Sequence, residues 1–170
     1  AIYWANLYPE EVKAVIGLEP LVTGFIEEAE EKPSLSPLIT ILTRTGLVRN
    51  QPEVFDNNFE AAKKGLLTAK EAEIARTIFY RRVQTKNMWE EVEMVEKNSQ
   101  LVSEQNKSGV PFYAFVSSQN EEKSWQNSIN SYAEAASGQI FILDGTHYIH
   151  LDYPKLIADK SKEIIEKNID

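Results

Sequence analysis

The sequence predicts a mixed α/β fold built on a small parallel sheet with flanking helices. The first observation behind this expectation is that three short runs are apolar on both faces, as is typical of strands that helices cover on both sides. These runs lie at residues 13–19, 109–118 and 139–145. The second observation is that helical patterns follow the second and third runs, which is the connectivity of parallel neighbours. We therefore expect three adjacent parallel strands.

The block between the first and second runs predicts the domain organisation. Residues 21–108 show helical periodicity and no strand pattern. A helical block between two strands of one sheet is typical of a cap, or lid, inserted into an α/β core. We expect residues 1–20 and 109–170 to form the core and residues 21–108 to form an all-helical cap.

The opening residues predict a buried helix that follows an earlier part of a longer polypeptide. Residues 1–9 are strongly apolar, and no Ser, Thr, Asp or Asn precedes them as a helix cap. They lack the basic region and the cleavage site of a secretory signal. We expect this chain to be the C-terminal part of a longer polypeptide.

Two helices should flank the predicted strands of the core. One is expected over residues 121–137, with Gly138 in the C′ position, where a left-handed backbone favours glycine. The other should begin at Pro154, because proline is favoured at the first helical position, and run to about Asn168.

The predicted cap contains clear helix signals. Thr68 and Glu71 have the spacing of a capping box, so a helix should start directly after Thr68. A second amphipathic helix should open near Asn87. Shorter helices are expected at residues 34–48 and 54–67.

Composition excludes several classes of function. The chain of 170 residues has 18 Lys and Arg against 26 Asp and Glu, a net charge of −8, and no cysteine. This charge repels phosphate backbones, so nucleic acid is not an expected partner. The missing cysteines exclude disulfides, thiol nucleophiles and Cys-based metal sites. The longest apolar run, about seven residues, is far short of the roughly 20 that cross a bilayer, so no membrane span is expected.

A histidine follows the third predicted strand and is the candidate general base. His147 lies in the loop Asp144-Gly145-Thr146-His147, at the end of a strand where open α/β sheets bind their ligands. An imidazole there can accept and return a proton near neutral pH. His150 is expected to be structural, since no further ligands lie at the spacing of a metal site.

Such a base needs a carboxylate on its other ring nitrogen, and two acids follow predicted strands. Glu19 ends the first strand and is followed by Pro20. Glu121 comes after the second strand, where an acid in the first turn of a helix is also explained by the helix dipole. We prefer Glu19 and keep Glu121 as the alternative.

At these residues the chain resembles an α/β-hydrolase, from just after the nucleophile to the C-terminus. The likeness is strongest over residues 145–154, which are similar to the family's Gly-x-His loop and the following apolar-His-Leu-acid-x-Pro stretch. Pro9-Glu10-Glu11-Val12 before the first strand is also similar to many members. The resemblance implies that residues 21–108 correspond to the family's cap and that His147 is the catalytic histidine.

The acid departs from the commonest pattern of that family. Most members carry Asp after the second of these strands, and Asn120 stands at the matching position here. Certain haloalkane dehalogenases and their relatives place a Glu after the earlier strand, which Leu18-Glu19-Pro20 resembles. A register shift of one residue would instead match Glu121.

The resemblance also implies that the nucleophile lies before residue 1, together with the oxyanion-hole donors. No Gly-x-Ser-x-Gly elbow occurs in the chain. The serines near the predicted site have no elbow context; they are Ser117, Ser118, Ser124 and Ser128. The chain alone should be inactive, and its expected partner is the N-terminal half of the fold, covering the strand edge at residues 12–18.

The implied function is hydrolysis of a small acyl ester by a nucleophile–histidine–acid triad. One alternative is a dehalogenase-like or epoxide-hydrolase-like enzyme with an Asp nucleophile. Another is a non-catalytic ligand-binding protein on the same scaffold. No organic cofactor or metal is implied, and the cytoplasm is the default location.

Aromatic side chains of the cap are candidates for an apolar roof over the substrate. They are Phe55, Phe59, Phe79, Tyr80 and Trp89. We expect Phe59 and Trp89, together with Tyr148 beside the catalytic histidine, to contact the substrate. For any single cap aromatic, packing between helices is the simpler interpretation.

Overall fold

The computed structural model describes residues 1–22, 36–83, 85–105, 108–119 and 123–169. The chain divides into two compact units. Residues 1–30 and 96–170 form the first, and residues 31–95, which interrupt it in the sequence, form the second. A compact unit is not by itself a functional domain, so the predicted core and cap boundaries stay a prediction.

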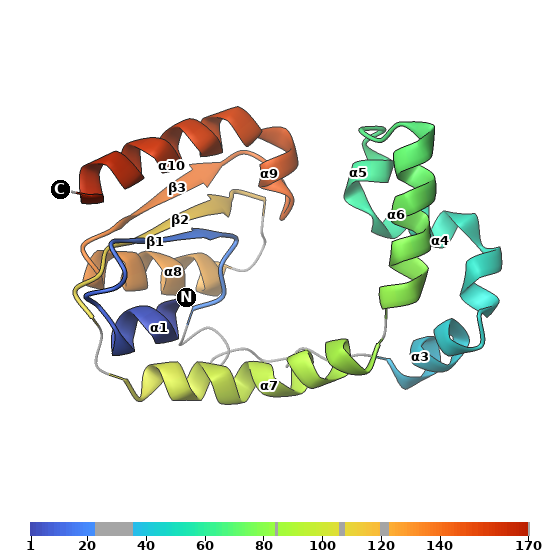
Figure 1. Cartoon of the computed structure of the whole chain (residues 1–170), viewed down its shortest axis with the longest axis horizontal. Coiled ribbons are helices and arrows are strands. Elements are labelled where there is room, and N and C mark those ends of the chain that lie inside the picture. The colour runs from blue at the N-terminus through green and yellow to red at the C-terminus, as the bar shows by residue number, and fades with distance from the viewer. Residues whose placement is uncertain (23–35, 84, 106–107, 120–122, 170) are drawn as a thin grey trace. The chain divides into compact units, whose positions relative to one another are not determined.

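The described part of the first unit contains a three-stranded parallel sheet (Figure 1). Its strands are β1 (Val15–Leu18), β2 (Phe112–Ser117) and β3 (Gln139–Leu143), in the order β1-β2-β3. β2 is buried along its whole length because it has a neighbour on each side and helices on both faces. The predicted mixed α/β fold with a parallel sheet is confirmed.

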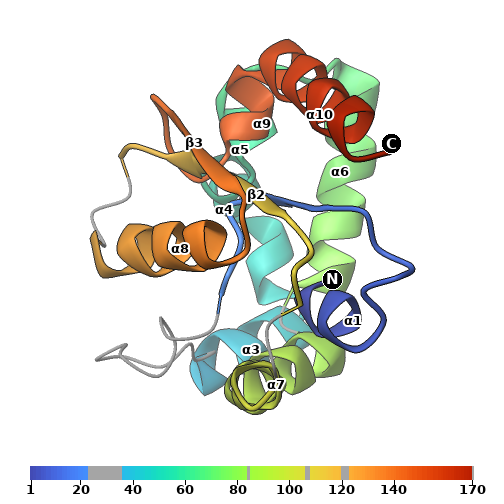
Figure 2. The same cartoon turned by 90° about the vertical axis from the view of Figure 1, so that its left-hand side faces the viewer.

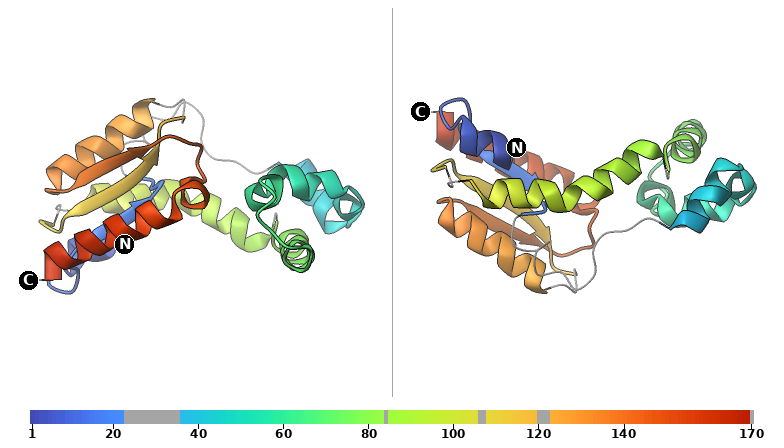
Figure 3. Two further views of the ribbon diagram at one scale, coloured as in Figure 1. Left: turned by 90° about the horizontal axis from the view of Figure 1, so that it is seen from above. Right: turned by 90° about the horizontal axis from the view of Figure 1, so that it is seen from below.

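Alternate residues of β2 pack on opposite faces of the sheet, as strand geometry requires. Phe112, Ala114 and Val116 join a core with α8 (Lys123–Ala135), to which Ala5 of α1 (Ile2–Leu7) also belongs. Phe115 joins a second core on the other face, with Leu143 of β3 and residues of α9 (Ile149–Asp152) and α10 (Pro154–Ile169). Figures 2 and 3 show α8 and α10 on opposite sides of the sheet.

Asn6 fastens α1 to the segments around it. Its amide donates to Gln105 Oε1 over 3.3 Å, and its side-chain oxygen accepts from the Ser108 backbone N–H over 3.1 Å. It also bonds to the hydroxyl of Tyr132 on α8. Burial raises the pKa of Tyr132 above its ordinary value of 10.0, and the bond to Asn6 opposes this only in part.

This raised pKa predicts how stability depends on alkaline pH. Above pH 10 the unfolded chain releases the Tyr132 proton before the folded chain does, so the free energy of unfolding falls as pH rises through the folded pKa. Tyr132→Phe should flatten that fall, which urea unfolding between pH 8 and 11 would measure. An equally steep decline in the variant would contradict the assignment.

The predicted burial of the first helix is wrong. α1 forms, but Ala5 is its buried residue, whereas Tyr3 and Trp4 are 44% and 51% exposed. The apolar pattern indicated a helix correctly, but burial depends on what packs against it. Within the described residues, only one side of α1 is covered.

The prediction for Gly138 is also wrong in its detail. The left-handed residue at the C′ position of α8 is Ser137, with φ 54°. Gly138 is the next residue and donates to Ala133 O over 2.8 Å, which completes a Schellman motif. Glycine is needed there because a Cβ would lie 1.7 Å from the carbonyl oxygen of Phe112.

Helices form the described part of the second unit, and its capping box is confirmed. The elements are α3 (Pro37–Arg44), η1 (Leu47–Asn50), α4 (Pro52–Asn58), α5 (Glu60–Lys63), α6 (Ala69–Arg82) and the first part of α7 (Lys86–Ser103). Thr68 and Glu71 cap α6 reciprocally. Each predicted short helix is instead two pieces, because Gly46 adopts φ 78° and Phe59 is extended.

Candidate functional site

Glu19 occupies a strained turn directly after β1. Its φ is 49°, a left-handed conformation that costs a residue with a side chain on the order of 1–3 kcal/mol. Its backbone N–H donates to Phe115 O over 2.9 Å, which extends the pairing of β1 with β2 by one residue. Pro20 folds back so closely that a Cβ on Gly17 would lie 2.8 Å from its ring. The turn therefore holds Glu19 at the carboxyl edge of the sheet.

The carboxylate of Glu19 is buried and supplied with hydrogen-bond donors. Only 3% of its side chain is exposed. The backbone N–H of Ser117 donates to Oε1, and the Ser117 hydroxyl donates to Oε2 over 3.1 Å. A carboxylate removed from water requires such partners. Strain and burial together make Glu19 a candidate functional residue.

His147 reaches this carboxylate from the loop after β3. Its Nδ1 lies 3.3 Å from Glu19 Oε2, although 128 residues separate the two in the sequence. A carboxylate only accepts hydrogen bonds, so this contact favours a proton on Nδ1, and in that neutral tautomer Nε2 is the acceptor nitrogen. The His147 side chain is 68% exposed. An acceptor nitrogen on an oriented, accessible imidazole is what a general base requires.

The loop that carries His147 is tied to the segment after β2. Backbone N–H groups of Ser118 and Gln119 donate to Leu143 O and Gly145 O over 2.8 and 3.2 Å. The carboxylate of Asp144 accepts from the Ser118 hydroxyl and the Gln119 amide over 3.1 and 3.3 Å. The last residue of β2, Ser117, therefore contacts Glu19, and the residues that follow it contact the histidine loop.

Sequence reasoning found Glu19 and His147 but missed the groups that hold them. Ser117 was considered only as a nucleophile, and it is completely buried. Asp144, named above only as part of the His147 loop, anchors the segment after β2 through its carboxylate. One feature of the sequence indicates that Ser117 has a hydrogen-bond partner. It ends an otherwise apolar strand, where a buried hydroxyl needs a partner.

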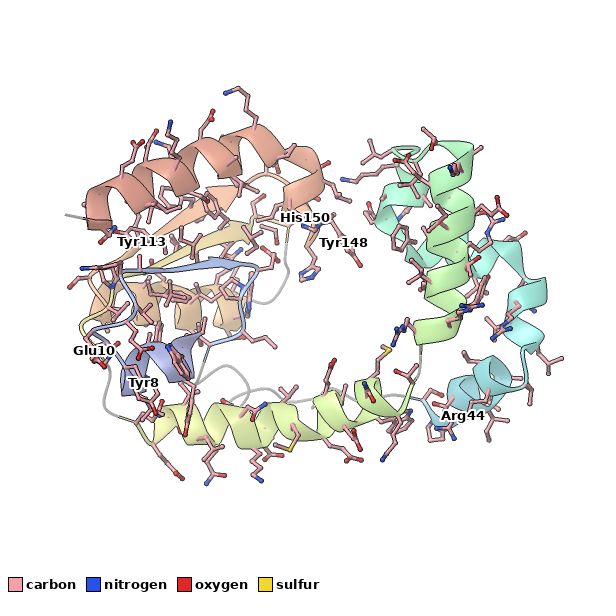
Figure 4. The ribbon with its side chains drawn as sticks, viewed as in Figure 1. Tyr8, Glu10, Arg44, Tyr113, Tyr148 and His150 are labelled. Atoms are coloured by element: carbon pink, nitrogen blue, oxygen red, sulfur yellow. The ribbon has the colours of Figure 1, made fainter. Side chains whose placement is uncertain are left out.

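Tyr148 lies beside His147, and His150 lies near Tyr148, as the labelled side chains of Tyr148 and His150 in Figure 4 show. The Tyr148 ring is 37% exposed and packs edge-on against His147, with centroids 5.2 Å apart. His150 is exposed, and its ring is 6.1 Å from that of Tyr148. Tyr148 is therefore placed to contact a molecule that reaches His147.

The remaining predicted residues lie outside the described part of the chain or in the second unit. Glu121 and Asn120 fall outside the described residues. In the second unit, Phe59 stacks on Phe55 with centroids 5.1 Å apart, and Trp89 Nε1 donates to Thr40 Oγ1 over 3.1 Å.

Two of the aromatic residues predicted for the cap, Phe55 and Tyr80, are buried in packing contacts, which the sequence also allowed. Phe55 is fully buried, and its ring meets Phe79 edge-on at 5.6 Å. Tyr80 is 7% exposed, and its hydroxyl donates to Gln51 O over 2.9 Å.

Among the residues that the structure describes, no three His, Asp or Glu side chains gather as a metal site. In the same part of the chain, each helix is too short or too polar to cross a membrane. No family model, curated protein or solved structure matches the chain.

Proposed function

We propose that the chain is the C-terminal portion of an α/β-hydrolase that cleaves a small carboxylic ester, with His147 as general base and Glu19 as its acid partner. The observation that carries this proposal is the contact between Glu19 Oε2 and His147 Nδ1 at the carboxyl edge of the sheet. The strained backbone of Glu19 supports it, because such strain concentrates at functional sites.

The proposed chemistry uses the two ring nitrogens of His147 separately. Nε2 takes the proton of a nucleophilic hydroxyl while the oxygen of that hydroxyl bonds to the ester carbonyl carbon. Glu19 keeps the proton of Nδ1 in place and stabilises the imidazolium. Nε2 then returns a proton to the leaving alkoxide, and the acyl intermediate forms. The same nitrogen activates a water that hydrolyses the intermediate to the carboxylic acid.

The nucleophile in this proposal comes from a further strand and turn beside β1. The chain contains no Gly-x-Ser-x-Gly elbow, and Ser117 is buried against Glu19. In the described part of the sheet, β1 pairs with β2 alone. A parallel strand added at the free edge of β1 would end near Glu19, because the carboxyl ends of parallel strands share one edge. Residues 21–108 act as the cap of this enzyme.

The test is covalent labelling of the complete polypeptide that carries this chain. A fluorophosphonate forms a phosphonyl ester with an activated serine and releases fluoride. We expect one labelled serine, outside these 170 residues, and labelling slowed by His147→Ala but not by His150→Gln. Labelling of no serine, or equal labelling in both variants, would contradict a serine nucleophile activated by His147.

An Asp nucleophile is the second candidate, and the position of Glu19 favours it. The acid follows β1 instead of β2, which resembles haloalkane dehalogenases. An enzyme with an Asp nucleophile would form an aspartyl ester with its substrate and would not react with the fluorophosphonate. Single turnover in H₂¹⁸O, with a haloalkane or an epoxide, would then place ¹⁸O in an aspartate, which mass spectrometry of the peptides detects.

A further inference from the structure

We propose that Ser117 is the positioning residue of the site, which acts through Glu19 to hold His147 in its Nδ1-protonated form. The loss of activity that we expect rests on the proposed function. The positioning role itself rests only on the observed contacts of Ser117.

Ser117 is the group that contacts both oxygens of the Glu19 carboxylate. It ends β2, is completely buried, and donates its backbone N–H to Oε1 and its hydroxyl to Oε2. Oε2 is the same oxygen that lies 3.3 Å from His147 Nδ1. The hydroxyl of Ser117 therefore decides where the acceptor for the imidazole proton lies.

Helix α8 hydrogen-bonds both to Ser117 and to the turn that follows Glu19. Gln126 Nε2 donates to the carbonyl oxygen of Ser117 over 2.7 Å. The neighbouring Trp125 Nε1 donates to Pro20 O over 3.1 Å, in the turn directly after Glu19. Adjacent side chains of one helix thus contact both the serine and the turn that follows the acid.

The strained turn explains why the hydroxyl matters. Glu19 has a left-handed backbone that nothing in its own sequence favours, so its side chain stays in place only through its contacts. Removing the Ser117 hydroxyl leaves Oε2 with one fewer donor and lets the carboxylate rotate away from the ring. A displacement of about 1 Å in a catalytic group can cost about 100-fold in rate.

The test compares Ser117→Ala with Ser128→Ala in the complete polypeptide. Ser128 is a matched control because its hydroxyl bonds to Ser124 O within α8, outside the site. For Ser117→Ala we expect kcat for short esters to fall about 10- to 100-fold with KM little changed. Ser128→Ala should keep the wild-type kcat. A kcat for Ser117→Ala equal to that of Ser128→Ala would overturn the proposal.

A second measurement needs no turnover and separates this inference from the proposed function. These 170 residues contain two histidines, and the ¹⁵N-histidine signals that His147→Gln and His150→Gln remove from the complete polypeptide assign the two imidazoles. Ser117→Ala and Glu19→Gln should each lower the population of the Nδ1-protonated form of His147 and leave His150 unchanged. In the Glu19→Gln background, Ser117→Ala should add nothing, because the serine acts through the glutamate. This pattern without ester hydrolysis would support the positioning role and refute the function.

The opposite pattern would refute the positioning role and keep the function. In it, Glu19→Gln changes the His147 ring and turnover while Ser117→Ala changes neither. Urea unfolding of each variant shows that a lost signal does not come from a lost fold. Ser117→Ala removes one oxygen and adds no atom, so the buried site accommodates it without a clash.

Discussion

Replacing His147 by alanine should reduce kcat of the complete polypeptide on short p-nitrophenyl esters by about 10⁴-fold or more. The imidazole contacts the buried Glu19 carboxylate through Nδ1, and its side chain is 68% exposed. Without it, the nucleophile keeps its proton and the leaving group receives none. KM should change much less than kcat, because the ring acts mainly in the transition state.

His150→Gln is the matched control for this experiment. His150 lies three residues further along, is exposed, and contacts Tyr148 instead of Glu19. The His150→Gln variant should keep wild-type turnover. If His147→Ala also keeps turnover, His147 has no part in the reaction. If the wild-type polypeptide hydrolyses no ester, haloalkane or epoxide but still binds apolar ligands, the scaffold is a binding protein.

The second large effect is expected for Glu19→Gln. A glutamine can still accept from the Ser117 N–H, so the turn and the fold should survive. Its amide nitrogen donates where Oε2 accepted, which favours the wrong tautomer of His147. In a serine protease the comparable change lowers kcat about 10⁴-fold, and we expect a loss of similar order.

Glu121→Gln is the comparison that decides which acid serves the histidine. Glu19 has the observed contact, so Glu19→Gln should cause by far the larger loss of kcat. A larger loss in Glu121→Gln would transfer the acid role to that residue. Comparable, small losses in both variants would mean that His147 works without a carboxylate partner.

Much of the fold followed from patterns that are local in the sequence. Doubly apolar runs predicted all three strands, with boundaries shifted by a few residues, because a strand between two helical layers must be apolar on both faces. The capping box predicted the start of α6 because both of its hydrogen bonds join residues three apart. Glu19 and His147 were predicted for a related reason, since strand ends in parallel sheets share an edge.

Other features depended on contacts between residues far apart in the chain. Ser117 became the partner of Glu19 because the register of β1 on β2 places it beside that turn, and no spacing in the sequence contains this register. Ser137 takes the left-handed position because Gly138 must admit the Phe112 carbonyl, a neighbour 26 residues away in sequence.

By itself, the sequence determined the three described strands, the capped start of α6, and the positions of Glu19 and His147 after strand ends. Periodicity and capping are properties of neighbouring residues, so the chain alone contains them. The tertiary structure decided which oxygen faces which nitrogen, how Glu19 is held, and which face of α1 is covered. These depend on register and packing across the sheet, where a shift of one residue moves every side chain to the opposite face.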